Sequence, residues 1–173
     1  MKNGLKNTAL AALFLTLGIV LPFFTSQIHF IGNMLLPMHI PVLLCGLICG
    51  WKLGLSVGFI LPLLRSALFL MPVMYPNAIS MAFELAIYGG LSGAIYNKFT
   101  EKSIGKLYLS IVPTMLLGRI VWGVSKAILL NASGGSLTFK MFITGGFLNA
   151  IPGIALQLIL IPIIVTLIQK NKE

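Results

Sequence analysis

The 173-residue chain carries little charge for its length, and that charge is mostly positive. Only 9% of its residues are charged against 58% hydrophobic, the mean hydropathy is +1.02, and the formal net charge is +9 at pH 7. A water-soluble domain of this size could not bury so much apolar surface, so the composition predicts an integral membrane protein built of helices. The lysines form no basic stripe with interleaved aromatics, which argues against nucleic-acid binding.

Six apolar segments follow one another and predict an all-α bundle of six transmembrane helices in a single domain, residues 1–173. The expected spans are residues 5–24, 38–50, 53–71, 77–99, 106–130 and 141–168. Each is close to the ~20 residues that a bilayer requires, except the second, which is short. No small-residue cleavage site follows the first apolar run, so we interpret that run as a retained membrane helix rather than a signal peptide.

Lysines predict the orientation, because cytoplasmic loops are enriched in them. If the N-terminus is cytoplasmic, Lys140 falls outside, and the other lysines in the loops and at the segment ends fall inside: Lys2, Lys6, Lys52, Lys98, Lys102, Lys106, Lys170 and Lys172. Both termini are therefore expected in the cytoplasm.

Small residues recur at helical spacing in three regions of the sequence. The glycines Gly46, Gly50, Gly54 and Gly58, and then Gly89 and Gly93, predict closely packed helix backbones. In the first span Thr8, Ala12 and Thr16 form a ridge that suits either internal packing or docking of another membrane protein. Cys45 and Cys49 are expected as core thiols, because nothing near them completes a zinc ligand set. With three acidic residues in the chain, no metal site or other cofactor is expected.

Four ionisable side chains interrupt the apolar segments: Arg65, Glu84, Arg119 and Lys126. A charge in hydrocarbon costs ~2.5–3.5 kcal/mol on insertion scales, so such residues usually face a polar cavity and serve a function. Arg65 and Glu84 lie at matching depth in an antiparallel hairpin, so they could pair with each other or could contact a ligand. Three of the four groups are cations, which favours a small anionic solute.

Helical spacing places further polar groups beside these charges, because residues three and four apart share a face. The fifth span carries Trp122 between Arg119 and Lys126, and the fourth carries Met81 within its polar stripe. The sequence predicts a cavity in the outer half of the bundle, covered by segment 25–37 and lined by Arg65, Asn77, Glu84, Tyr88, Arg119, Trp122, Lys126 and Asn149.

Simpler roles remain open for several of these residues. Lys126 could extend to the outer interface without touching a ligand. Asn149, which shares a stripe with Gly145 and Gly153, could hydrogen-bond a neighbouring helix. His39, between Pro37 and Pro41, is expected to cap a helix rather than to bind a ligand.

Catalytic motifs are missing from the sequence. It contains no Ser/His/Asp set, no paired intramembrane carboxylates and no G-x-x-x-x-G-K-[ST] motif for ATP. The chain is therefore not expected to be an enzyme or to hydrolyse ATP itself.

Three segments resemble a known transporter family. They are LLPMHIPVLLCG at 35–46, GFILPLLR at 58–65, preceded by Gly50 and Trp51, and MAFELAIYG at 81–89. The pattern is similar to that of substrate-specific S components of energy-coupling factor (ECF) transporters, and the likeness in length, spans and charge covers nearly the whole chain. The resemblance implies a subunit of the bacterial plasma membrane that captures a vitamin-like nutrient from outside. It also implies partners, namely a membrane scaffold subunit and two ATPase subunits.

The resemblance also suggests substrates and a docking face. The pantothenate branch looks most similar, and pyridoxine-related and hydroxymethylpyrimidine branches are the alternatives. The family's Ala-x-x-x-Ala docking motif in the first span corresponds here to Thr8, Ala12 and Thr16, which departs from strict alanine.

Together these observations predict that Arg119 and Lys126 bind the negative group of the ligand. Trp122 is expected to pack on the ligand and Asn149 to hydrogen-bond it, while Arg65 and Glu84 shape the pocket. The rival hypotheses are a membrane-embedded enzyme acting on lipid head groups and a purely structural membrane subunit.

Overall fold

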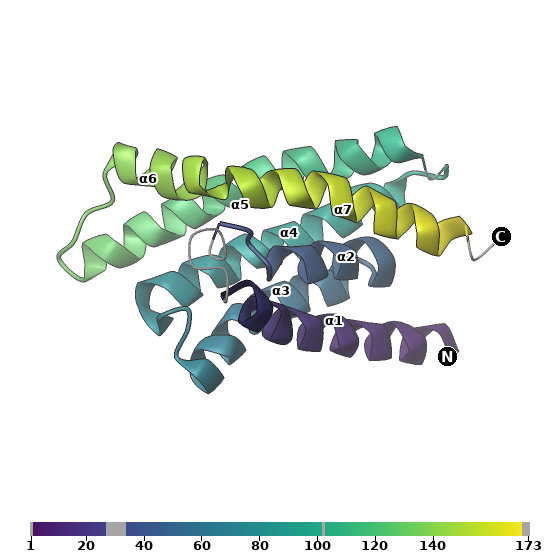
Figure 1. The fold of residues 1–173 in the computed structure, drawn as a ribbon, viewed down its shortest axis with the longest axis horizontal. Helices are drawn as coiled ribbons and strands as arrows, with labels where there is room; N and C mark the ends of the chain where they lie inside the picture. Colours follow the sequence, from purple (N-terminus) through teal and green to yellow (C-terminus); the bar gives the residue numbers. More distant parts are fainter. Residues whose placement is uncertain (1, 27–33, 102, 171–173) are drawn as a thin grey trace.

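The computed structural model describes residues 2–26, 34–101 and 103–170, and within these ranges the regular structure is helical. Figure 1 shows the long helices running along a common direction, with both ends of the chain at the same end of the bundle. The elements in chain order are α1 (Lys2–Ser26), α2 (His39–Cys49), α3 (Trp51–Phe69), a π-helical turn (Met74–Ala78), α4 (Ile79–Lys98), α5 (Ile104–Ala132), α6 (Phe139–Gly146), a 3₁₀ turn (Leu148–Ala150) and α7 (Ile151–Lys170).

Five of the expected spans are long and apolar enough to cross a membrane, and the other, α2, is not. The five, as described, are Gly4–Thr25, Trp51–Phe69, Met74–Lys98, Ile104–Ala132 and Phe139–Ile168. With 11 residues, α2 reaches only about 16 Å, roughly half the hydrocarbon thickness. The last span is also not one helix, because the chain breaks between α6 and α7.

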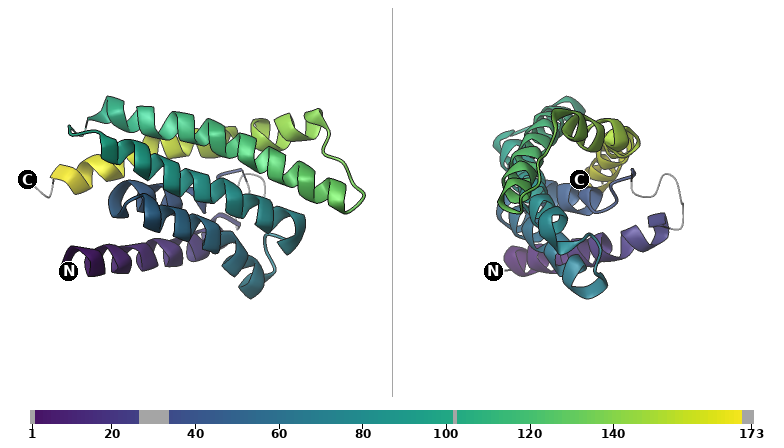
Figure 2. Two further views of the ribbon diagram at one scale, coloured as in Figure 1. Left: turned by 180° about the vertical axis from the view of Figure 1, so that it is seen from behind. Right: turned by 90° about the vertical axis from the view of Figure 1, so that its left-hand side faces the viewer.

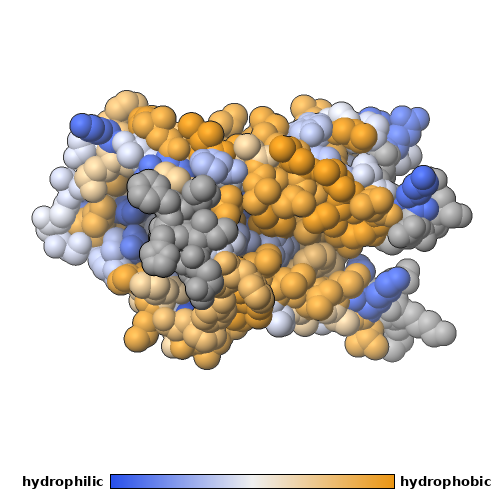
Figure 3. Space-filling view, viewed as in Figure 1, coloured by the Kyte–Doolittle hydropathy of each residue, from blue (hydrophilic) through white to orange (hydrophobic). Residues whose placement is uncertain are grey.

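The surface agrees with a bilayer location. On the face that Figure 3 shows, hydrophobic residues cover much of the middle of the molecule, and the most hydrophilic residues lie towards its two ends. Many large apolar side chains are exposed along the helices, for example Leu116, Ile120, Val124 and Ile128 on α5. The composition and these exposed faces together indicate a multi-pass membrane protein.

The core forms where α4 packs against α2, α3 and α5, while α1 lies at the edge of the bundle beside α2 and α3 (Figure 2). Glycine makes this packing possible. A Cβ atom on Gly89 would lie 2.1 Å from the carbonyl oxygen of Gly54, and one on Gly46 would lie 2.1 Å from that of Gly89. The predicted close packing of backbones is confirmed at these positions. Gly50 has a different role, because its φ of +101° forms the sharp connection between α2 and α3.

Gly89→Ala is expected to destabilise the protein. The new methyl group would meet backbone atoms, which cannot move aside as a flexible side chain can, and such overpacking costs about 1–3 kcal/mol. Gly105→Ala, in the exposed first turn of α5 with nothing within 4 Å, is the matched control. Alanine should stabilise that position by up to ~1 kcal/mol. Thermal unfolding of both variants in detergent should therefore shift in opposite directions, and a Gly89→Ala midpoint equal to or above wild type would contradict this packing.

Candidate functional site

A cavity of about 390 Å³ is lined by the C-terminal end of α1 and the N-terminal end of α4, the ends of these helices that lie away from the chain termini. Its volume falls in the range of small-molecule sites, ~300–1,000 Å³. The walls come from every long helix except α7, together with the segments that precede α2 and follow α3. The lining residues are Pro22, Thr25, Leu36, Pro37, Met38, His39, Arg65, Met71, Pro72, Val73, Asn77, Met81, Glu84, Arg119, Trp122 and Gly145.

Helical periodicity brings the polar residues of α4 and α5 to this cavity. Asn77 of the π-helical turn and Met81 and Glu84 of α4 line the cavity, and Tyr88 lies buried one turn further along α4. On α5, Arg119 and Trp122 line the cavity from the facing helix. Because Gly118 leaves the Tyr88 ring room to approach α5, the Tyr88 hydroxyl reaches the Met115 carbonyl at 3.4 Å.

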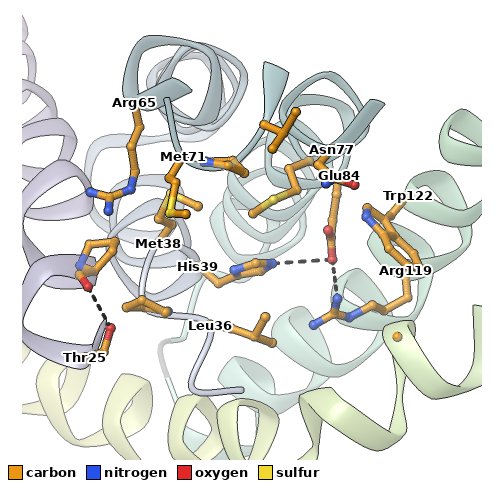
Figure 4. Close-up of a pocket in the computed structure, with 16 residues that line it drawn as sticks. Thr25, Leu36, Met38, His39, Arg65, Met71, Asn77, Glu84, Arg119 and Trp122 are labelled. Carbon is orange, nitrogen blue, oxygen red and sulfur yellow. Dashed lines mark hydrogen bonds and ion pairs between the residues drawn. The ribbon is translucent and has the colours of Figure 1, made fainter. Parts of the chain in front are cut away.

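Glu84 lies at the centre of a buried charge cluster (Figure 4). Its Oε1 atom is 3.0 Å from Arg119 Nη1 and 3.4 Å from His39 Nε2, and all three side chains are at least 95% buried. Both contacts are electrostatic pairs without the alignment of a hydrogen bond. Arg119 Nε and Nη2 and both His39 nitrogens have no hydrogen-bond partner among the described residues. Buried polar atoms without a partner are rare in folded proteins, so each of these calls for an explanation.

Arg65 occupies the other side of the cavity, away from Glu84 (Figure 4). Its Nη1 donates a hydrogen bond to the backbone carbonyl of Ile19 in α1. Its guanidinium carbon lies 4.8 Å from the ring centroid of Phe23 and 5.7 Å from that of Phe69. Within the described chain no carboxylate pairs with Arg65, because Glu84 pairs with Arg119 and His39 and Glu101 with Lys106.

The possible Arg65–Glu84 pair is therefore not formed. Matching depth along two helices does not fix the direction in which their side chains point around the helix axes. Arg65 is directed towards α1, and Glu84 is directed towards α5.

Lys126 and Asn149 do not line the cavity. Lys126 continues the α5 stripe, and its ammonium lies 4.7 Å from the centroid of the Trp122 ring. Asn149 is exposed in the 3₁₀ turn. The expected stripe of Gly145, Asn149 and Gly153 requires one continuous helix. Because the helix breaks between α6 and α7, Gly145 lines the cavity while Gly153 packs against the backbone of residues 34–35.

His39 is the polar lining residue that sequence reasoning assigned to another role. It is the first residue of α2, but it makes no side-chain cap, and its ring packs edge-on against Tyr88 at 5.1 Å. A signal for it was present in the sequence, since a lone buried carboxylate such as Glu84 requires nearby donors. For the apolar lining residues, such as Met38 and Met71, nothing in the sequence indicated a position in the cavity wall.

Segment 25–37 contributes Thr25, Leu36 and Pro37 to the cavity wall. The rest of the expected cover, residues 27–33, lies outside the described residues. Cys45 and Cys49 are buried in the core and form no disulfide, in keeping with the expected core position. Thr8, Ala12 and Thr16 are exposed on α1, so this ridge packs against no other element of the described structure.

The family model of the ECF transporter substrate-specific component matches residues 6–165, which is nearly the entire chain. Comparison with curated proteins and with solved structures gave no match.

Members of this family are membrane subunits of transporters rather than enzymes: they bind a small substrate and work with a scaffold and ATPases. The cavity of the present structure is the kind of site that such a subunit requires, since it is concave, small and lined by a few polar groups among apolar ones. The chain therefore belongs to the family of substrate-specific components of ECF transporters.

Proposed function

We propose that the protein captures a small anionic, carboxylate-bearing nutrient in this cavity, and that pantothenate is its substrate. The observation that carries the proposal is the charge balance of the walls. Two guanidinium groups, those of Arg65 and Arg119, and one carboxylate, that of Glu84, line the cavity. The surplus positive charge in an apolar surrounding attracts an anion strongly, because charges interact more strongly away from water.

The side chains have different roles in this proposal. Arg65 and Arg119 hold the negative group of the ligand, and the unpartnered Nε and Nη2 of Arg119 supply donors once the ligand enters. Trp122 packs on the ligand, and Asn77 hydrogen-bonds its polar end. Lys126 adds positive charge beside the Trp122 ring. Glu84, supported by His39 and Tyr88, holds Arg119 in place, and Asn149 has no part because it lies away from the cavity.

The proposed orientation places the cavity on the outside of a bacterial cell membrane and both termini in the cytoplasm. Lysines support this orientation, since Lys6, Lys52, Lys98 and Lys106 occur at helix ends on the side of the termini. In this arrangement the nutrient enters from outside, and a scaffold and two ATPase subunits drive its uptake.

The exposed ridge of Thr8, Ala12 and Thr16 is the proposed docking face for the scaffold. Ala12→Trp should abolish association with the scaffold, because a bulky side chain there prevents close helix approach. Pantothenate binding should stay unchanged, since the ridge is far along α1 from the cavity. Co-purification with the scaffold measures the first effect and calorimetry the second. Leu17→Trp, at a 40% exposed position on another face of α1, is the control. Equal co-purification of the two variants would contradict this docking face.

Titration of the purified protein with pantothenate and with panthenol tests the substrate. The two compounds differ only at the carboxylate, which is a hydroxymethyl group in panthenol. A charge-assisted hydrogen bond is worth about 1.5–3 kcal/mol, so we expect pantothenate to bind at least ~10-fold more tightly. Pyridoxine and hydroxymethylpyrimidine carry no carboxylate and complete the panel. Binding of either of these alone, or equal binding of panthenol, would contradict the proposal.

A further inference from the structure

The cavity-side end of α1, residues 19–25, is attached to the bundle along a narrow face. The buried residues of α1 form one stripe, Ala11, Phe14, Gly18 and Pro22. Their neighbours Val20 and Phe24 are 39% and 70% exposed. Pro22 has no backbone N–H, so it cannot complete the helical hydrogen bond to the carbonyl of Gly18. This end of α1 therefore depends on side-chain contacts to hold its position.

Arg65 provides such contacts from α3. Its Nη1 donates to the Ile19 carbonyl, and its guanidinium stacks beside Phe23 and Phe69. The two rings themselves meet edge to face, with centroids 4.8 Å apart. Arg65, Phe23 and Phe69 together form a small cluster that joins α1 to α3, which we call the α1 latch.

The α1 latch is also part of the cavity wall. Arg65 lines the cavity together with Pro22 and Thr25 of α1 (Figure 4). A guanidinium has five N–H donors, and the described hydrogen bond to Ile19 uses one of them. The same group can therefore hold α1 with one donor and an anion in the cavity with others.

We infer that Arg65 couples occupancy of the cavity to the position of the cavity-side end of α1. This inference rests on the proposed function, because it requires an anionic ligand. An anion held by Arg65 restricts the guanidinium and keeps Nη1 on the Ile19 carbonyl, so the ligand tightens the α1 latch. By linkage, whatever loosens the latch weakens ligand binding by the same factor. Because α1 also carries Thr8, Ala12 and Thr16, a filled cavity fixes the cavity-side end of the helix that presents this ridge.

The first test needs no ligand and uses hydrogen exchange of the backbone amides of Phe23, Phe24 and Thr25 in the full chain. Arg65→Gln and Phe23→Ala should each speed their exchange, because each removes part of the latch. Phe24→Ala is the matched control, because it removes the ring of the adjacent residue, which is more exposed than Phe23 and is not part of the latch. Unchanged exchange in both latch variants overturns the latch, whatever the substrate proves to be.

The second test adds pantothenate. In the wild type, pantothenate should slow hydrogen exchange of the same amides by about 5-fold or more, which is the lower end of typical coupling between two sites. Exchange of the amides of residues 5–11 should not change. Phe23 does not line the cavity, yet Phe23→Ala should weaken pantothenate binding by a similar factor while Phe24→Ala does not. If Phe23→Ala binds pantothenate with wild-type affinity, or if the wild type binds pantothenate without slower amide exchange, the coupling is overturned and the proposed function is not. No binding of pantothenate or any other small carboxylate by the wild type overturns the proposed function, and the coupling with it.

Discussion

Arg119→Ala should weaken pantothenate binding by one to two orders of magnitude. The substitution removes the proposed charge-assisted hydrogen bonds between Arg119 and the ligand, which are worth about 1.5–3 kcal/mol each. It also leaves one cation, Arg65, and one anion, Glu84, in the cavity wall, so their charges cancel. The cavity then no longer attracts an anion. Isothermal titration of the purified variant measures the loss directly.

The control for this prediction separates binding from folding. Arg119→Ala alone leaves the Glu84 carboxylate buried beside His39 without its cation, which destabilises the protein. Arg119→Ala combined with Glu84→Gln removes that buried negative charge and should fold more stably while still binding poorly. If the double variant binds pantothenate with wild-type affinity, Arg119 has no direct role in holding the ligand.

Glu84→Ala should be the most destabilising substitution in the cavity. Glu84 is 1% exposed, and its removal leaves the guanidinium of Arg119, which is 4% exposed, without a counter-ion. Breaking one partner of a buried ion pair costs about 3–5 kcal/mol, whereas replacing both partners by apolar groups costs much less. Thermal unfolding should therefore show a large loss for Glu84→Ala and a partial recovery when Arg119→Met is added.

Glu101→Ala is the matched control for this stability prediction. Glu101 is likewise paired with a cation, since its Oε2 atom lies 3.2 Å from Lys106 Nζ, but its side chain is 88% exposed. An exposed pair of this kind is worth about 0–1 kcal/mol. Equal losses of stability from Glu84→Ala and Glu101→Ala would show that the cluster around Glu84 is not a buried pair.

The sequence predicted a helical membrane bundle well because hydropathy reports on the bilayer directly. Glycine spacing likewise predicted close backbones, since at Gly46 and Gly89 the space beside each Cα is filled by the facing helix. Short elements were harder to predict. α2 is apolar enough for a span, but its 11 residues end at Gly50, where a positive φ turns the chain back.

The site was predicted less completely than the fold. Periodicity within one helix correctly grouped Asn77 with Glu84 and Arg119 with Trp122. It could not say how two helices are rotated relative to each other, which is why Arg65 contacts α1 rather than Glu84. It also assumed that the last span was continuous, and the break at residues 148–150 removed Asn149 from the cavity.

The interpretation as a binding subunit depends on one physical claim, that the buried cations hold a small organic anion in this cavity. Mass spectrometry of the denatured wild-type protein, purified without added ligand, tests that claim most directly. We expect release of a small carboxylic acid in an amount comparable to the protein, and little or none from Arg119→Ala combined with Glu84→Gln. Release of the same compounds in the same amounts from both proteins, or of a molecule without any acidic group, would contradict the claim.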